Sequence, residues 1–260
     1  RSDSSTDLMK DKVKMAAIAP SRPYVAGPME SQRFAHRREA YWAGIQEIIG
    51  MGVPPADLIH HAPAFAGHMN IARYLALYEA YKMALPFAGH IAEAGIYKGT
   101  CTLLFAKLVR LFEPEALTLV HGFDWFQGAR NDGSAEASLV EPGAYAASAE
   151  WVQKLVDVQG LSDIVRVHDM NLAKELPAFF ARHAHMQFKL VFLDCGYYDV
   201  VKACIEEFWP RLTPGGVLVL DNLNHETAPG ETLAVREMLP NSRIRSFGFA
   251  FQPTSYIVKE

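Results

Sequence analysis

The feature that most constrains the fold is a regular alternation of short apolar segments and longer amphipathic ones, which begins at His90. This alternation is typical of a parallel sheet, because two parallel strands can be joined only through a long crossover connection. We expect strands at residues 90–96, 117–124, 164–169, 188–195 and 216–221. The segments between and after them predict helices near 100–112, 146–159, 172–183, 199–211 and 229–239. The sequence therefore predicts an α/β fold.

The C-terminal end departs from this alternation. Two strand-like runs, 243–250 and 254–259, are joined by a short turn at Gln252-Pro253 that leaves no room for a helix. They are predicted to form an antiparallel hairpin. Five β-α units followed by a hairpin make seven strands, and this outline resembles the Rossmann-like sheet of class I S-adenosylmethionine (SAM) methyltransferases. A dinucleotide dehydrogenase would continue with a sixth parallel strand.

The residues before the sheet divide into two parts. Residues 1–30 contain three prolines and predict a flexible lead-in. Residues 31–86 predict a helical extension, with helical patterns at 34–49 and 69–85, that acts as a lid or dimer surface or simply packs on the sheet. Residues 87–260 then form the SAM-binding methyltransferase domain. Within it, residues 125–145 lack periodicity and predict a lid or binding loop.

Composition limits the partners and the compartment. Lys and Arg total 25 against 29 Asp and Glu, so the chain lacks the positive surface that nucleic acid requires. No apolar run is long enough to span a membrane, and the N-terminus lacks the apolar core of a signal peptide. The three cysteines form neither a zinc nor a disulfide pattern. We expect a cytoplasmic protein with no nucleic-acid or membrane partner.

A glycine-containing turn follows the first expected strand. Gly95 and Gly99 permit a tight turn and close approach of the backbone to a ligand, and the next helix offers free N–H groups to an anion. In a methyltransferase this anion is the carboxylate of SAM, and Thr100 adds a hydroxyl donor. The spacing E-x-G-x-x-x-G differs from the G-x-G-x-x-G of pyrophosphate sites. The alternative interpretation is an ordinary strand–helix turn.

Acidic residues end the next two strands. Asp124 can accept hydrogen bonds from both ribose hydroxyls of a nucleoside, and Asp169 can accept one from the adenine amine. Each carboxylate has an alternative role as a helix cap or loop residue. Because ligands of open α/β sheets bind at the carboxyl ends of the strands, these landmarks together predict a nucleoside site at that edge.

The fourth and fifth strands end in Asp194 and in Asp221-Asn222. Two carboxylates and an amide oxygen are hard ligands that suit Mg²⁺ or a similar divalent cation. Such an ion can bind a substrate hydroxyl and lower its pKa. The alternative is that Asp194 is a catalytic or capping carboxylate and no metal binds. His225 is either a general base or solvated surface.

From about Phe65 to the C-terminus, the chain resembles the macrocin O-methyltransferase family, which methylates sugar hydroxyls on macrolides and related natural products. The resemblance rests on the segments Glu93–Gly99, Gly122–Gly128, Leu193–Tyr198 and Trp209–Gly216, the last leading into Leu220-Asp221-Asn222. It implies a Mg²⁺-dependent SAM O-methyltransferase with the metal on Asp194, Asp221 and Asn222, and it places His68-Met69 near SAM. The expected cofactor-binding residues are Met69, Glu93, Ala94, Gly95, Tyr97, Gly99, Thr100, Asp124, Asp169 and Asp194.

Three departures from the family pattern concern the acceptor side. Gly196 stands where the family has a second aspartate, and Asn222 replaces an aspartate, as in catechol-type O-methyltransferases. Ala129-Arg130-Asn131 follows where the family has Leu-Pro. The resemblance therefore does not name the acceptor.

Three hypotheses follow. The first is methylation of a sugar hydroxyl on a glycosylated natural product, for example in antibiotic biosynthesis, with Asp194 or His225 removing the proton. The second is a catechol or phenol acceptor, and the third is a noncatalytic SAM-fold binding protein. The expected partners are a small-molecule acceptor and further copies of the chain in a homodimer or larger homo-oligomer.

Overall fold

The computed structural model describes residues 35–130, 140–226 and 228–260. The predicted lead-in and residues 131–139 of the expected loop lie outside this part. The described chain forms a seven-stranded sheet in the order β3-β2-β1-β4-β5-β7-β6. The strands are β1 (His90–Ala94), β2 (Val120–Asp124), β3 (Val165–Asp169), β4 (Phe188–Leu193), β5 (Leu212–Leu220), β6 (Ile244–Ser246) and β7 (Ser255–Val258).

The pairing confirms the expected sheet. Strands β1 to β5 pair in parallel, whereas β7 runs antiparallel to both β5 and β6. The hairpin connection is longer than the expected turn, because the chain leaves the sheet after Ser246 and buries Phe247 against Tyr256. Strand β5 also starts earlier than expected, since Leu212 pairs with Phe188 before the register shifts.

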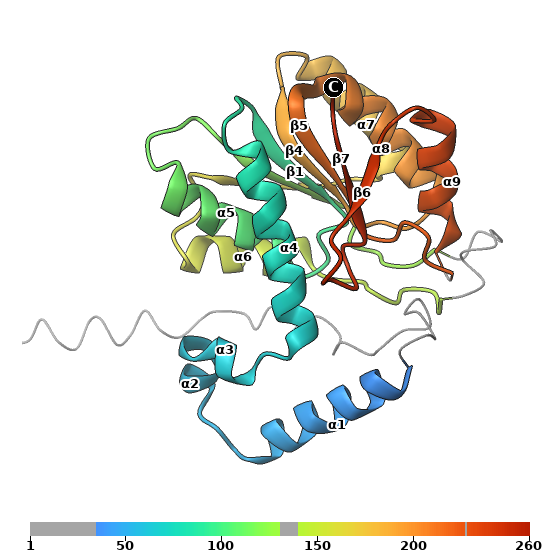
Figure 1. Ribbon diagram of the computed structural model, residues 1–260. Coiled ribbons are helices and arrows are strands. Elements are labelled where there is room, and N and C mark those ends of the chain that lie inside the picture. Colours follow the sequence, from blue (N-terminus) through green and yellow to red (C-terminus); the bar gives the residue numbers. More distant parts are fainter. Residues whose placement is uncertain (1–34, 131–139, 227) are drawn as a thin grey trace, which may run out of the picture.

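Helices cover both faces of the sheet (Figure 1). On one face lie α4 (His68–Ala84), α5 (Thr100–Phe112) and α6 (Ala149–Val158). On the other lie α7 (Leu172–Arg182), α8 (Tyr198–Arg211) and α9 (Pro229–Met238). Alternate residues of β4 serve the two faces, because Leu190 and Phe192 pack with the first group and Val191 and Leu193 with the second. This double burial explains why β4 is apolar apart from Lys189, whose buried ammonium group pairs with Glu113.

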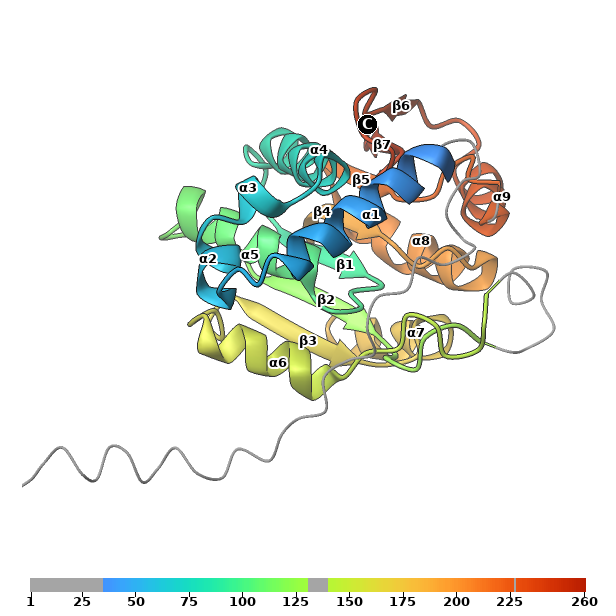
Figure 2. The same ribbon diagram turned by 90° about the horizontal axis from the view of Figure 1, so that it is seen from below.

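Three helices lie beyond the carboxyl ends of the parallel strands. They are α1 (Ala35–Gly50), α2 (Pro55–His60) and α3 (Ala62–Phe65), of which only α1 was expected from sequence. Helix α1 lies below the sheet in Figure 1 and in front of β1 and β4 in Figure 2, so it extends across the end of the sheet.

Helix α4 connects these helices to the sheet. Its C-terminal half buries Ala76, Leu77, Ala80, Tyr81 and Ala84 against the sheet and α5. This half therefore packs on the sheet, which was one of the alternatives predicted for the helical extension. Its N-terminal half extends toward α1 (Figure 1).

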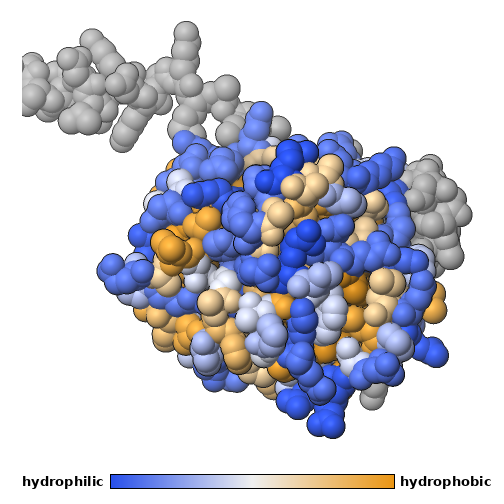
Figure 3. All heavy atoms as spheres, turned by 90° about the horizontal axis from the view of Figure 1, so that it is seen from above, coloured by the Kyte–Doolittle hydropathy of each residue, from blue (hydrophilic) through white to orange (hydrophobic). Residues whose placement is uncertain are grey.

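The outer surface has a mixed character. The face seen in Figure 3 carries hydrophilic residues interspersed with smaller hydrophobic groups. None of the described helices combines the length and the apolar character that crossing a bilayer requires.

Candidate active site

A cavity of about 670 Å³ opens at the carboxyl ends of β1, β2, β4 and β5. This volume lies in the range of small-molecule and cofactor sites. Its floor includes Glu93, Asp124 and Asp194 from the sheet, and its far wall includes Tyr41 of α1 and Arg73 of α4. The N-terminal helices therefore complete a site that the sheet alone would leave open.

The turn after β1 brings backbone to the cavity. Gly95 has φ +91°, and a Cβ there would lie 2.1 Å from the carbonyl oxygen of Asp194. Gly99 has φ +82°, and a Cβ there would lie 2.9 Å from Val152 Cγ1. Both positions therefore require glycine. Gly95, Tyr97 and Thr100 line the cavity, while Gly99 supports the turn from behind.

Asp124 is fixed by the same turn. Its Oδ2 accepts a hydrogen bond from the backbone N–H of Tyr97 and its Oδ1 accepts one from Phe126, each at 2.8 Å. Burial raises the pKa of Asp124, and these hydrogen bonds oppose that rise. Each oxygen retains a lone pair, so this cavity-lining carboxylate can accept further bonds from ligand hydroxyls.

Glu93 is a second buried acid on the cavity. Only 1% of its surface is exposed, and it accepts a hydrogen bond from the Thr102 hydroxyl. Burial raises the pKa of Glu93 to about 8. The adjacent Ala94 is fully buried and serves the sheet instead of lining the cavity.

The structure brings Asp194 and Asp221 together, because Leu193 and Leu220 pair at the ends of neighbouring strands. Arg73 of α4 joins the two carboxylates. Its Nη2 donates to Asp194 Oδ2 at 2.5 Å, and its Nη1 donates to Asp221 Oδ1 at 2.6 Å. Sequence reasoning did not single out Arg73. Its one available signal was its spacing of four residues from Met69, which places both on one helix face.

Burial dominates the electrostatics of this pair. It raises the pKa of Asp221 well above the ordinary value, and nearby Asp194 adds to the rise while Arg73 opposes it. Behind the pair, Glu231 of α9 is fully buried and accepts a hydrogen bond from the Asn222 N–H at 2.7 Å. The Asn222 side-chain oxygen accepts one from Gln252 Nε2, also at 2.7 Å. Two of the predicted metal ligands, Asp194 and Asp221, thus share Arg73 as their hydrogen-bond donor. The third, Asn222, accepts from Gln252 and lines the same cavity.

Comparison with known proteins identifies this arrangement. The model of a family described as a methyltransferase domain matches residues 92–223, half of the chain, which includes most of β1 and the whole of β2 to β5. The chain belongs to that family. A search of curated proteins finds no match to this methyltransferase.

Solved structures agree on the fold. The calicheamicin methyltransferase CalS11 superposes with a TM-score of 0.72 at 23% identity, covering 83% of this chain and 91% of its own. An apo structure, described as CalS11, TDP-rhamnose 3′-O-methyltransferase, gives 0.69 at 23% identity, with 83% and 93% covered. The O-methyltransferase NovP gives 0.62 at 17% identity, with 73% and 80% covered. The class I SAM methyltransferase fold predicted from sequence is confirmed.

The far wall of the methyltransferase cavity is aromatic. Tyr41, Trp42 and Ile45 recur at helical spacing on α1 and line the cavity. Tyr41 donates its hydroxyl hydrogen to Asn70 Oδ1 at 2.7 Å, and its ring meets Trp42 edge to face. Met69, predicted from sequence to approach SAM, lines the cavity from α4. The sequence did not predict these α1 residues as site residues, because an apolar stripe at helical spacing is equally typical of a helix that packs on the core.

A second arginine shapes the side of the cavity. Arg130 donates two hydrogen bonds to the Asp199 carboxylate, at 2.6 and 2.7 Å, and its guanidinium lies 4.6 Å above the Tyr197 ring. Gly196, where the family pattern has an aspartate, lines the cavity beside them. Arg130 belongs to the rewritten loop motif, which therefore contributes directly to this wall.

Besides Ala94 and Gly99, two further predicted site residues, Asp169 and His225, do not line the methyltransferase cavity. Asp169 is exposed and lies on a separate shallow groove beside α6, because it shares a strand face with Val167 on the edge strand β3. The adenine contact of Asp169 stays a prediction. Asn171 and Leu172, at the start of α7, line the cavity in that region.

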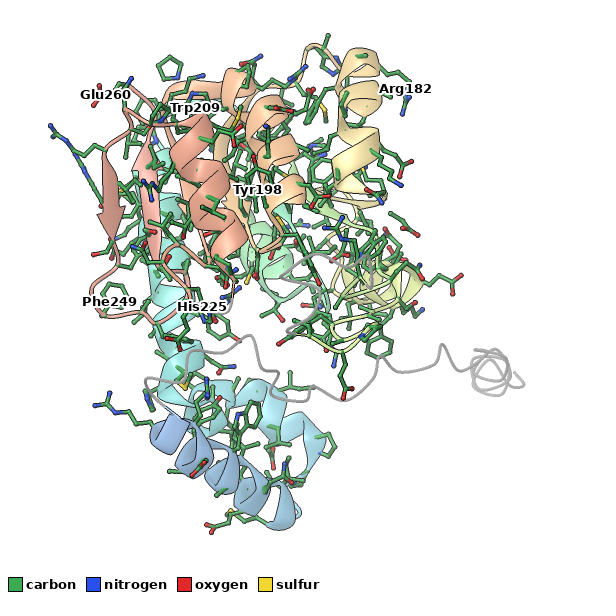
Figure 4. The ribbon with its side chains drawn as sticks, turned by 90° about the vertical axis from the view of Figure 1, so that its right-hand side faces the viewer. Arg182, Tyr198, Trp209, His225, Phe249 and Glu260 are labelled. Carbon is green, nitrogen blue, oxygen red and sulfur yellow. The ribbon has the colours of Figure 1, made fainter. Side chains whose placement is uncertain are left out.

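His225 is the second of these residues outside the cavity lining. Its backbone N–H donates a hydrogen bond to the Asn222 carbonyl oxygen within a turn, and only 5% of its surface is exposed. Its ring lies 5.8 Å from that of Phe251, which itself lines the cavity, whereas His225 does not. Figure 4 shows His225 in the loop between β5 and α9. It is therefore not solvated surface, and its role as a general base stays a prediction.

Proposed function

We propose that this methyltransferase transfers the methyl group of SAM to a hydroxyl oxygen of a sugar on a small molecule, such as a glycosylated natural product. The observation that carries this proposal is the composition of the cavity at the carboxyl ends of the strands. One side combines a glycine turn with Glu93 and Asp124, and the other combines Tyr41 and Trp42 with Asp194 between them.

The glycine side suits SAM. The backbone turn at Gly95 allows close approach of the methionine part, and Asp124 accepts hydrogen bonds from the ribose hydroxyls. Glu93 supplies a carboxyl group where the methionine ammonium would lie. Met69, Tyr97 and Thr100 complete this side from the helices and the turn.

The aromatic side suits a sugar, because the C–H faces of a pyranose pack on aromatic rings while its hydroxyls seek polar groups. Asn70 and Arg130 offer such groups on the same cavity. Support also comes from CalS11, whose description as a TDP-rhamnose 3′-O-methyltransferase concerns a sugar hydroxyl. Together with the macrocin-type motifs, this favours a saccharide over a catechol.

A divalent cation such as Mg²⁺ fits the chemistry of the donor set Asp194, Asp221 and Asn222. When bound, it would lower the pKa of the acceptor hydroxyl. The side chain of Asp194 is 28% exposed and that of Asp221 only 3%, so Asp194 is the group that can reach the acceptor and take its proton. The amide of Gln252 holds the Asn222 side chain in place.

The helical part is proposed to act as a lid. In this proposal residues 31–86 supply the far wall through α1 and α4 and residues 87–260 supply the SAM site, while the predicted lead-in, residues 1–30, lies outside the described part of the chain. Two such chains are proposed to associate as a homodimer, for which light scattering at micromolar concentration is the direct measurement.

The test is a methyl-transfer assay with SAM and three acceptors: a glycosylated macrolide, a nucleoside-diphosphate sugar and a catechol. We expect a product one methyl group heavier from at least one saccharide, together with S-adenosylhomocysteine, and none from the catechol. Methylation of the catechol alone would overturn the sugar assignment. The noncatalytic alternative predicts no methyl transfer at all.

A further inference from the structure

We propose that Arg73 is a built-in cation that competes with a divalent metal ion for Asp194 and Asp221, so that the ion binds there only when Arg73 leaves. This inference rests on the proposed function for its meaning, but it concerns metal binding alone. The geometry that carries it is the fork of the guanidinium, whose two terminal nitrogens each hold one carboxylate, at 2.5 and 2.6 Å.

The two cations need the same place. A divalent ion contacts carboxylate oxygens at about 2.0–2.6 Å, so an ion shared by both residues must lie between them. Arg73 already spans that gap with Nη1 on Asp221 and Nη2 on Asp194. A second positive group within a few ångströms would also be repelled by the guanidinium, and this repulsion is strong in a poorly solvated site.

Charge balance points to exchange and not to coexistence. Asp194 and Asp221 carry two negative charges when ionised, and one divalent ion neutralises both. An ion together with Arg73 would leave the cluster with excess positive charge.

The contacts of Arg73 explain why the metal-free state is stable. Asp221 is 2% exposed, and a carboxylate so deeply buried is costly without a partner. Arg73 also donates from Nε to Cys101 Sγ at 3.5 Å, and its guanidinium lies 5.3 Å from the Phe192 ring centre. Its own side chain is 21% exposed on the cavity side, which gives it a path out of the pair.

The experiment measures Mn²⁺ affinity by the electron paramagnetic resonance signal of the free ion, with the full chain as wild type and as Arg73→Met. We expect Arg73→Met to bind Mn²⁺ about tenfold tighter or more, because the competing charge is gone. The matched control is Arg130→Met, which removes the same charge from the same cavity but from Asp199, and it should stay within about twofold of wild type. Asp221→Asn in the Arg73→Met background should abolish the gain.

Three results would overturn the proposal: equal or weaker Mn²⁺ binding by Arg73→Met, an equal gain in Arg130→Met, or no Mn²⁺ binding by any variant. If Arg73→Met does not fold, Arg73→Lys replaces it, since one ammonium cannot span both carboxylates and a smaller gain is expected. Binding of S-adenosylhomocysteine in EDTA, measured on the same samples, tests the proposed function separately and does not enter this comparison.

Discussion

Asp194 and Asp221 end neighbouring strands, yet they face different surroundings. Asp221 is enclosed between Arg73 and the protein interior, whereas part of Asp194 faces the cavity. We therefore assign proton acceptance to Asp194 and a holding role to Asp221. Asp194→Asn is expected to lower kcat by about 10²–10⁴-fold, the usual contribution of a general base.

The measurement is the initial rate at saturating SAM and acceptor, with the melting temperature as a check on folding. Asn keeps the size of the side chain and one acceptor for Arg73, so the fold should persist. Turnover by Asp194→Asn equal to that of the wild type would remove Asp194 from the mechanism.

A histidine pair inside the sheet predicts sensitivity to acid. His121 is 2% exposed, its Nδ1 lies 3.1 Å from His168 Nε2, and the two rings are stacked. Burial lowers the pKa of His121 from 6.5 to about 3, and His168 contributes to the shift. The unfolded chain therefore binds a proton that the folded chain rejects, and the free energy of unfolding should fall as the pH drops from 6.5 toward 3.

His121→Phe should shift the midpoint of acid unfolding to lower pH, as followed by circular dichroism, because the ring that resists protonation is gone. His60→Phe is the control, since His60 is exposed on α2 and should leave the midpoint unchanged. Equal midpoints for His121→Phe and the wild type would assign the acid sensitivity to other groups.

At the scale of elements, the proposed function gives helix α1 a role in acceptor choice. Trp42 lines the cavity from this helix, with its ring edge to face against Tyr41. Trp42→Ala is expected to raise the KM for the acceptor about tenfold, the order of one lost aromatic contact, with little change in kcat.

The KM for SAM should be unaffected by Trp42→Ala, because SAM is assigned to the opposite side of the cavity. Ile49→Ala is the control on the same helix, since its side chain is 62% exposed. An equal rise in the KM for SAM and the KM for the acceptor would mean that α1 maintains the shape of the cavity and does not contact the acceptor specifically.

Most elements were predictable from sequence because their physics is local. Strand β4 is apolar apart from Lys189, and α5 carries apolar residues at helical spacing, so a short stretch of sequence is enough to predict either element. The short helices α2 and α3 contain no buried residue, and nothing in their pattern distinguishes them from a loop. The β6–β7 connection was misjudged because burial of Phe247 is a tertiary event.

At the scale of the whole molecule, what sequence predicts depends on distance along the chain. The residues at strand ends, such as Asp124 and Asp194, could be placed together because parallel strands share one edge. The Arg73–Asp221 ion pair joins two residues that lie 148 positions apart in the sequence and belong to different parts of the fold, and no periodicity in the sequence predicts it. The positions of His225 and Asp169 outside the cavity lining could not be predicted for the same reason, since their orientation is set by packing around a loop and on an edge strand.

The most direct test of the account is a calorimetric titration of S-adenosylhomocysteine into the wild-type protein and into Asp124→Ala. We predict a single site of micromolar affinity in the wild type, and a loss of about tenfold or more in the variant, because two hydrogen bonds to a charged group disappear. Lack of binding by the wild type, or equal affinity in both proteins, would contradict the assignment of this cavity to SAM.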